Sequence, residues 1–234
     1  MTNDKKFITD SPKVNFFFGL ILGIAVVSLA GFGYMATKSS DDFEVNLANQ
    51  NNQQVAGEQQ DGQPTVDLQI TDGDHYLGDK NARVKIFTFS DFQCPYCARH
   101  HETMHQLVDE YGDKIAWVFK QFPIASHPLG MPGAIASECA GEQGKFWEMS
   151  DIIFENQSEL TEDSFAGFAV NLGMDVDQFN SCVTDNKYQD KILTDYNTGV
   201  DAGVRGTPSN FINNELVPGA VPYEQIQQLI DSKL

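Results

Sequence analysis

Apolar and polar positions divide the 234-residue chain into three parts. Residues 14–36 contain no charged side chain and are long enough to cross a bilayer as one helix, at about 1.5 Å per residue against roughly 30 Å of hydrocarbon. Residues 37–66 are rich in Asn, Gln, Asp and Gly, with too few large apolar side chains to form a core. We therefore expect a transmembrane signal-anchor, a flexible linker and a folded domain at residues 67–234.

The apolar runs of the expected domain predict a mixture of strands and helices. Two short runs, residues 84–90 and 115–122, are typical of buried strands, and a helical pattern at residues 98–108 lies between them. A strand, a helix and a strand at this spacing predict a βαβ unit, with two parallel strands joined by a right-handed crossover. We expect residues 67–70 to form a short edge strand.

Helical spacing of apolar residues dominates residues 128–203, whose aromatic stripes we assign to the core. The pattern then changes: a short strand follows Pro208, and the pair Asn213–Asn214 predicts a hairpin turn to a second strand. Pro222 is expected in the first turn of the last helix. The sequence thus predicts an α/β domain with helices inserted between its two halves.

The charges around residues 14–36 predict their orientation. Lysines occur in the leader, residues 1–13, and acidic side chains soon follow the apolar stretch. The positive-inside rule then places the N-terminus in the cytoplasm and the domain on the extracytoplasmic side of the cell membrane. The alternative is a signal peptide cleaved near residues 28–30, which would release a secreted or periplasmic protein.

The composition excludes some classes of partner. A formal net charge of −18 argues against nucleic acid, which requires a basic face. Four cysteines are too few for a disulfide-dense mini-protein, but they suit a domain with one functional pair and one structural bridge. We expect no cofactor.

The close pair of cysteines, Cys94 and Cys97, stands between a predicted strand and a predicted helix. The free backbone N–H groups and the dipole of a helix start favour a thiolate over a thiol. A C-x-x-C motif in this context predicts a redox-active dithiol.

The other two cysteines, Cys139 and Cys182, both lie in the predicted inserted helices. We expect a structural disulfide between them. Two buried free thiols are the alternative.

Three histidines, His100, His101 and His105, follow the dithiol on one predicted helix. Together with Cys94 and Cys97, His100 or His101 would form a ligand set for a thiophilic metal, and a non-enzymatic metal-binding module is therefore a competing hypothesis. We favour no metal site here, because histidines on a solvated helix usually have no ligand.

Three motifs in this order resemble the DsbA-like branch of the thioredoxin superfamily. They are the C-x-x-C segment at residues 90–97, the helical stretch at 138–147, and Gly206-Thr207-Pro208 within residues 203–208. The resemblance covers residues 77–234. It implies a thioredoxin fold with an inserted helical subdomain and the activity of a protein thiol–disulfide oxidoreductase. It also implies that the Thr207–Pro208 peptide bond is cis and faces the dithiol.

The resemblance assigns roles to the motif residues. Cys94 is expected to be the exposed, low-pKa sulfur, and Cys97 the shielded resolving one. Substrate is expected to contact Pro95 and Tyr96 on one side, and the backbone of Thr207 and Pro208 on the other.

One position departs from the family pattern. Many members have a buried acid six residues before the first cysteine, where this chain has Thr88. A carboxylate relay of protons is therefore not expected from this strand, because Asp91 should point elsewhere.

The expected partners also follow from the resemblance. They are unfolded, cysteine-containing secreted proteins and a membrane oxidant, linked to quinone, that reoxidises the dithiol. We expect a monomer. A disulfide isomerase or reductase is the alternative within the same chemistry.

Overall fold

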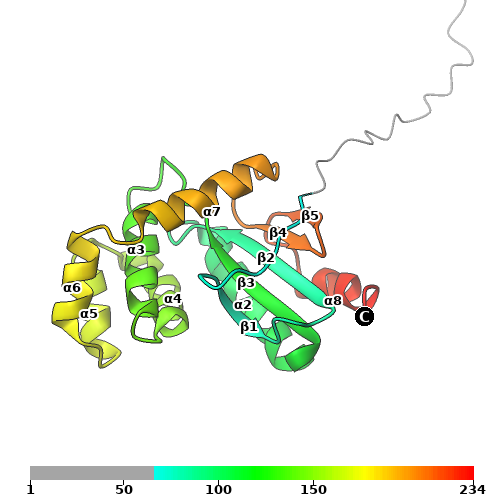
Figure 1. Cartoon of the computed structure of the whole chain (residues 1–234), viewed down its shortest axis with the longest axis horizontal. Helices are drawn as coiled ribbons and strands as arrows, with labels where there is room; N and C mark the ends of the chain where they lie inside the picture. Colours follow the sequence, from blue (N-terminus) through cyan, green and yellow to red (C-terminus); the bar gives the residue numbers. More distant parts are fainter. Residues whose placement is uncertain (1–65) are drawn as a thin grey trace, which may run out of the picture. The chain divides into compact units, whose positions relative to one another are not determined.

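The computed structural model describes residues 66–234, which contain a five-stranded sheet and its covering helices (Figure 1). The predicted leader, signal-anchor and linker lie outside the described residues. Within residues 66–234, no helix is both long enough and apolar enough to cross a membrane.

The sheet has the strand order β1-β3-β2-β4-β5. Its strands are β1 (His75–Gly78), β2 (Val84–Ser90), β3 (Ile115–Gln121), β4 (Ser209–Ile212) and β5 (Glu215–Pro218). The β2–β3 pair is parallel and the other three pairs are antiparallel. The central parallel pair is joined through helix α2 (Pro95–Tyr111), so the predicted βαβ unit is confirmed.

Both faces of the two central strands are covered. All of β3 and all of β2 except Lys85 are buried, which explains their nearly continuous apolar sequence. Ile86 packs in a cluster with Leu107 of α2, whereas Phe87 and Phe89 pack in a second cluster on the opposite face. The C-terminal end of β2 is thereby fixed at the centre of the sheet, where the chain enters α2.

The edge-strand prediction for residues 67–70 is wrong. This segment is irregular, and the edge position next to β3 belongs to β1. Leu68 is instead buried in the second cluster, and its N–H donates to the side chain of Asn214 at 3.2 Å. The apolar side chains of this segment therefore pack against the β4–β5 side of the domain without adding a strand to the sheet.

Five helices lie in sequence between β3 and β4. They are α3 (Gly130–Gly141), α4 (Phe146–Glu155), α5 (Ser164–Asn171), α6 (Val176–Thr184) and α7 (Gln189–Asp201). Figure 1 shows α3 to α6 grouped beside the sheet, and α7 running back across it toward β4. The first four helices thus form the inserted subdomain, and α7 returns the chain to the core sheet.

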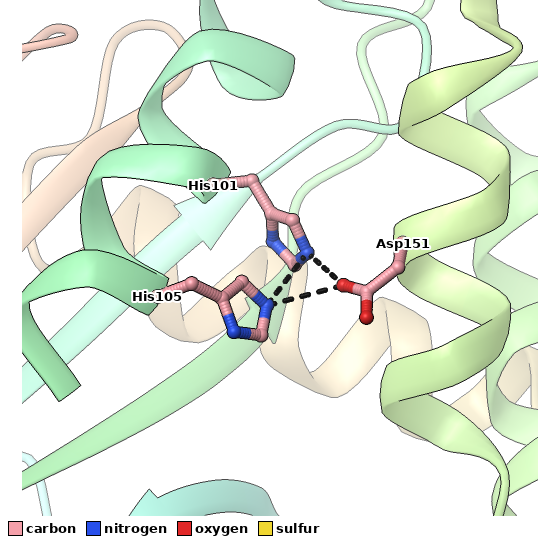
Figure 2. A group of neighbouring side chains, drawn as sticks. All are labelled: His101, His105 and Asp151. Carbon is pink, nitrogen blue, oxygen red and sulfur yellow. Dashed lines mark hydrogen bonds and ion pairs between the residues drawn. The ribbon is translucent and has the colours of Figure 1, made fainter. Parts of the chain in front are cut away.

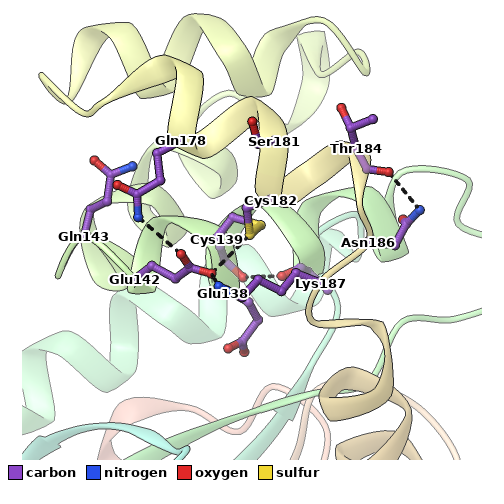
Figure 3. Close-up of a disulfide and its surroundings, with 12 residues drawn as sticks. Glu138, Cys139, Glu142, Gln143, Gln178, Ser181, Cys182, Thr184, Asn186 and Lys187 are labelled. Carbon is purple, nitrogen blue, oxygen red and sulfur yellow. Dashed lines mark hydrogen bonds and ion pairs between the residues drawn. A yellow bond between two sulfur atoms is a disulfide. The ribbon is translucent and has the colours of Figure 1, made fainter.

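A disulfide joins two of these helices. Cys139 of α3 is bonded to Cys182 of α6, with 5.8 Å between their Cα atoms (Figure 3). Just beyond the C-terminal ends of these two helices, Lys187 forms an ion pair of 2.6 Å with Glu142. These cross-links lie within the helical subdomain and do not involve the dithiol.

The C-terminal hairpin follows the predicted turn. Asn213 and Asn214 both have positive φ angles, of 47° and 68°, which Asn tolerates better than most residues. Pro222 stands immediately before α8 (Tyr223–Asp231), one position earlier than predicted.

Candidate active site

Cys94 occupies the N-cap of α2, and Pro95 follows at the first helical position. The Cys94 carbonyl accepts the N–H groups of Cys97 at 3.0 Å and Ala98 at 3.3 Å, which begins the helix. No side-chain hydrogen bond caps this helix start. The sulfur of Cys94 is therefore at the point where the uncompensated N–H groups of α2 favour negative charge.

Both cysteines are free thiols and both are buried, which corrects the expectation that Cys94 is exposed. The exposed fraction is 5% for Cys94 and 1% for Cys97. The Cys94 thiol lies 3.3 Å from the carbonyl oxygen of Thr207, so the loop before β4 covers it. Tyr96, by contrast, is 56% exposed.

The pKa values of the two thiols are shifted in opposite directions. A hydrogen bond from the Cys97 side chain outweighs burial, and together with hydrogen bonds from Thr207 and from the Cys97 and Tyr96 backbone it lowers the pKa of Cys94 from 9.0 to about 5. Burial and the neighbouring Cys94 raise the pKa of Cys97 well above 9.0. Near neutral pH, Cys94 is a thiolate and Cys97 a thiol, which is the division of labour that thiol–disulfide exchange requires.

This difference predicts the pH dependence of alkylation. In the reduced protein, the rate at which iodoacetamide modifies Cys94 should be level from pH 8 to 6 and fall with a midpoint at about pH 5, because the thiolate is the reactive form. Cys97 should remain unmodified, as peptide mass spectrometry would show. Cys97→Ala should move the midpoint to higher pH, since it removes the largest cause of the shift. A midpoint near 9.0 in the unsubstituted protein would contradict the assignment.

Three side chains to which the sequence assigned no role in the site hold the segment before α2. Gln157 donates to the carbonyls of Phe92 at 2.8 Å and Cys94 at 3.0 Å. The Gln93 side chain accepts the N–H of Leu129 at 2.7 Å. The third, Asp91, is completely buried. These contacts join positions 33 to 65 residues apart, so no local pattern indicates them.

The carboxylate of Asp91 accepts hydrogen bonds from backbone groups. It accepts the N–H of Gln93 at 2.7 Å and that of Ile124 at 2.6 Å, and His127 lies 3.1 Å away. Only the backbone N–H of Asp91 faces Cys97, at 3.5 Å from its sulfur. The carboxylate therefore positions the loop and makes no contact with Cys97.

Thr88, at the position of the family's acid, belongs to a buried polar network beneath the site. Its hydroxyl donates to Asn210 at 2.8 Å and accepts from Trp117 at 3.0 Å. The same Asn210 oxygen accepts from His100 at 2.7 Å. Burial lowers the pKa of His100 to about 4, so this histidine is neutral near pH 7. The network joins β2, β4 and α2 by neutral hydrogen bonds.

The loop before β4 forms the wall opposite the dithiol. The Thr207–Pro208 peptide bond is cis, as the resemblance predicts. The Pro208 carbonyl accepts the N–H of Gly219 at 2.8 Å, which connects the loop to the end of β5. The hydroxyl of Thr207 is one of the groups that favour the Cys94 thiolate.

A groove of about 470 Å³ lies beside this wall. Tyr96 and Arg99 of α2 line one side, and Thr207 and Val221 line the other. The Arg99 guanidinium is 4.8 Å from the centre of the Tyr96 ring, in cation–π geometry. Arg99 brings a positive charge to a site where the motif itself supplies none, and sequence analysis did not identify it.

The histidines of α2 do not converge on the cysteines. His100 and His101 are buried, contrary to the expectation of a solvated helix face. His100 bonds Asn210, and His101 bonds Asp151. Among residues 66–234, the one cluster of side chains placed to hold a metal ion is His101, His105 and Asp151, and it includes neither Cys94 nor Cys97.

Comparison with known proteins agrees with this geometry. A thioredoxin family model matches residues 70–232. A thioredoxin-like oxidoreductase from Silicibacter pomeroyi DSS-3 is 25% identical, with a TM-score of 0.62 over 69% of this chain and 92% of that one. The thiol-disulfide exchange protein alpha-DsbA2 from Wolbachia pipientis is also 25% identical, with a TM-score of 0.59 over 67% and 85%.

One curated relative is named for ion transport and not for thiol chemistry. It is the Na(+)/H(+) antiporter NhaA 1 of Salinispora arenicola, 31% identical over 171 residues, which are 71% of this chain and 26% of the antiporter. The chain spans about a quarter of the length of such relatives. The similarity therefore covers only part of these antiporters, and their name describes those proteins and not this chain.

Proposed function

This chain belongs to the thioredoxin family, and on that basis we propose that it introduces disulfides into secreted or membrane proteins by dithiol–disulfide exchange at Cys94 and Cys97. The observation that carries the proposal is the pairing of a low-pKa thiol with a high-pKa one at the start of α2. A stabilised Cys94 thiolate stabilises the reduced form, which makes the oxidised form a stronger oxidant.

The reaction proceeds by two exchanges. A substrate thiolate attacks Cys94 of the Cys94–Cys97 disulfide, a mixed disulfide forms, and Cys97 leaves and takes up a proton. A second substrate thiolate then attacks the substrate sulfur of the mixed disulfide, and Cys94 leaves as a thiolate. The substrate loses two electrons to the Cys94–Cys97 disulfide, which becomes the dithiol, and the substrate gains one disulfide.

Proton uptake at Cys97 follows from its surroundings. Its high pKa favours the thiol once the disulfide has opened. The carboxylate of Asp91 is occupied by two backbone N–H groups, and Thr88 is bonded to Asn210. We therefore propose that the proton comes from water or from the substrate thiol, without a carboxylate relay.

Substrate binding is proposed at the wall and the groove. An extended substrate segment would pair with the backbone at Thr207, beside Pro208, in the β-augmentation mode. Pro95 and Tyr96 would contact it from the helix side, and the groove beside Tyr96 and Arg99 would take a neighbouring side chain.

The proposed setting is the extracytoplasmic side of a membrane, with the protein a monomer. The Cys139–Cys182 disulfide supports an oxidising compartment, because such bonds are rare in the cytosol. Unfolded, cysteine-containing proteins would be the substrates. A membrane oxidant would return Cys94 and Cys97 to the disulfide form.

The equilibrium of the dithiol with glutathione tests the direction of the reaction. We expect a reduction potential between about −180 and −120 mV, the range of protein oxidants, because the Cys94 thiolate is stabilised. The redox state would be read by alkylation and mass spectrometry after equilibration in glutathione buffers. A potential near −270 mV, about that of thioredoxin, would contradict the oxidant and indicate a reductase.

A further inference from the structure

A second group of chemically reactive side chains lies between α2 and α4. His101 and His105 are four residues apart on α2, and hence on one face of the helix. Asp151 of α4 faces them, and Figure 2 shows the three side chains pointing toward one another. None of the three takes part in the exchange proposed for Cys94 and Cys97.

One possible metal-ligating atom from each side chain lies at the corner of a small triangle. His101 Nε2 is 2.6 Å from Asp151 Oδ1, His105 Nε2 is 3.1 Å from the same oxygen, and the two Nε2 atoms are 3.1 Å apart. Ligands about 2.0–2.1 Å from a tetrahedral ion stand roughly 3.3 Å from one another. A modest widening of the triangle would therefore place all three atoms at ligand distance from one zinc ion.

Hydrogen bonding alone leaves this arrangement poorly satisfied. If both Nε2 atoms carry hydrogens and donate to Asp151, two N–H groups meet at 3.1 Å. If only one carries a hydrogen, the other lone pair faces a carboxylate. A cation at the centre would interact favourably with both imidazole lone pairs and with the carboxylate.

The surroundings offer access and room for a fourth ligand. A cavity of about 350 Å³ opens beside the three side chains and is also lined by Glu102 and Glu155. His101 is 6% exposed, whereas the side chains of His105 and Asp151 are 33% and 40% exposed. Three carboxylates around the cavity make it attractive to a divalent cation, and water or a glutamate would complete a tetrahedron.

We propose that His101, His105 and Asp151 bind one Zn²⁺ ion, which ties α2 to α4. Two imidazoles and one carboxylate are a donor set that zinc accepts, with the fourth position open to the cavity. Nδ1 of His101 has no hydrogen-bond partner among the described residues. Since the loss of such an outer partner weakens metal binding by about 10- to 100-fold, we expect the affinity to be lower by about that factor than at a typical structural zinc site.

Zinc titration of the full chain tests the site. The dithiol is first oxidised, so that Cys94 and Cys97 cannot bind metal, and ZnCl₂ is then titrated by calorimetry in a non-coordinating buffer. We expect one ion per chain. His105→Gln and Asp151→Asn should each weaken binding by at least about tenfold. Asp113→Asn, an exposed acid elsewhere, is the matched control and should bind as the unsubstituted protein does.

A second measurement separates binding from folding. Zinc should raise the thermal unfolding midpoint of the unsubstituted protein and of Asp113→Asn, but not that of the two ligand variants. Both replaced ligands are partly exposed, so their variants are expected to fold, which circular dichroism would verify. The absence of saturable zinc binding, or equal binding by all variants, would overturn the proposal.

Discussion

Replacing Cys94 with Ser is expected to reduce the catalysed oxidation of a dithiol peptide to the uncatalysed rate. The variant cannot form the Cys94–Cys97 disulfide, and its hydroxyl is not ionised at neutral pH, so neither half of the exchange can occur. The measurement is the rate of peptide disulfide formation in glutathione buffer. Activity within a fewfold of the unsubstituted protein would show that another thiol does the chemistry.

The companion variant Cys97→Ser distinguishes the roles of the two sulfurs. It keeps Cys94 and places a hydroxyl where the resolving thiol stood. When a single-cysteine peptide is supplied as its mixed disulfide with glutathione, the Cys94 thiolate should displace glutathione, and the resulting Cys94–peptide disulfide should persist. Non-reducing electrophoresis and mass spectrometry would locate the adduct at Cys94. An adduct that forms equally well on Cys97 in the Cys94→Ser variant would contradict the assignment.

Removing the Cys139–Cys182 bond by a double substitution to Ala is expected to lower the free energy of unfolding by about 4 kcal/mol. The bond closes a loop with a sequence separation of 43, and opening it restores the conformational freedom of that loop in the unfolded chain. Urea unfolding, with Cys94 and Cys97 held in the same redox state in both proteins, would measure the change.

Two controls make this result specific to the bond. Mass spectrometry of the non-reduced protein should find a peptide linked through Cys139 and Cys182. Strong reductant should destabilise the unsubstituted protein but add little to the loss in the double variant. Alkylation of both cysteines without reductant, or a double variant of unchanged stability, would contradict the prediction.

Several features followed from local sequence. The parallel pair β2–β3 and the helix between them were predictable because buried strands and amphipathic helices have distinct apolar spacings. The position of Cys94 at the start of α2 was predictable for the same reason. The hairpin turn at Asn213–Asn214 was indicated because Asn is among the few residues that tolerate a positive φ.

The mistaken predictions all concern contacts between distant segments. Residues 67–70 have a composition typical of a strand, but Leu68 is buried in the second cluster and its N–H donates to the side chain of Asn214. His100 and His101 were assigned to a solvated face, yet Asn210 and Asp151, 110 and 50 residues away, hold their rings in buried positions. Polar side chains can be buried when such partners satisfy them, and local sequence does not reveal those partners.

The sequence by itself therefore determined the central β2–α2–β3 unit, the dithiol at the junction of β2 and α2, and the Gly-Thr-Pro segment before β4. Only the tertiary structure decided how far Cys94 is covered, which groups adjust its pKa, and where His101, His105 and Asp151 meet. The physical reason is range. Propensity and apolar spacing act over a few residues, whereas burial and hydrogen-bond geometry at a site depend on side chains that the completed fold brings together from 30 to more than 100 positions away.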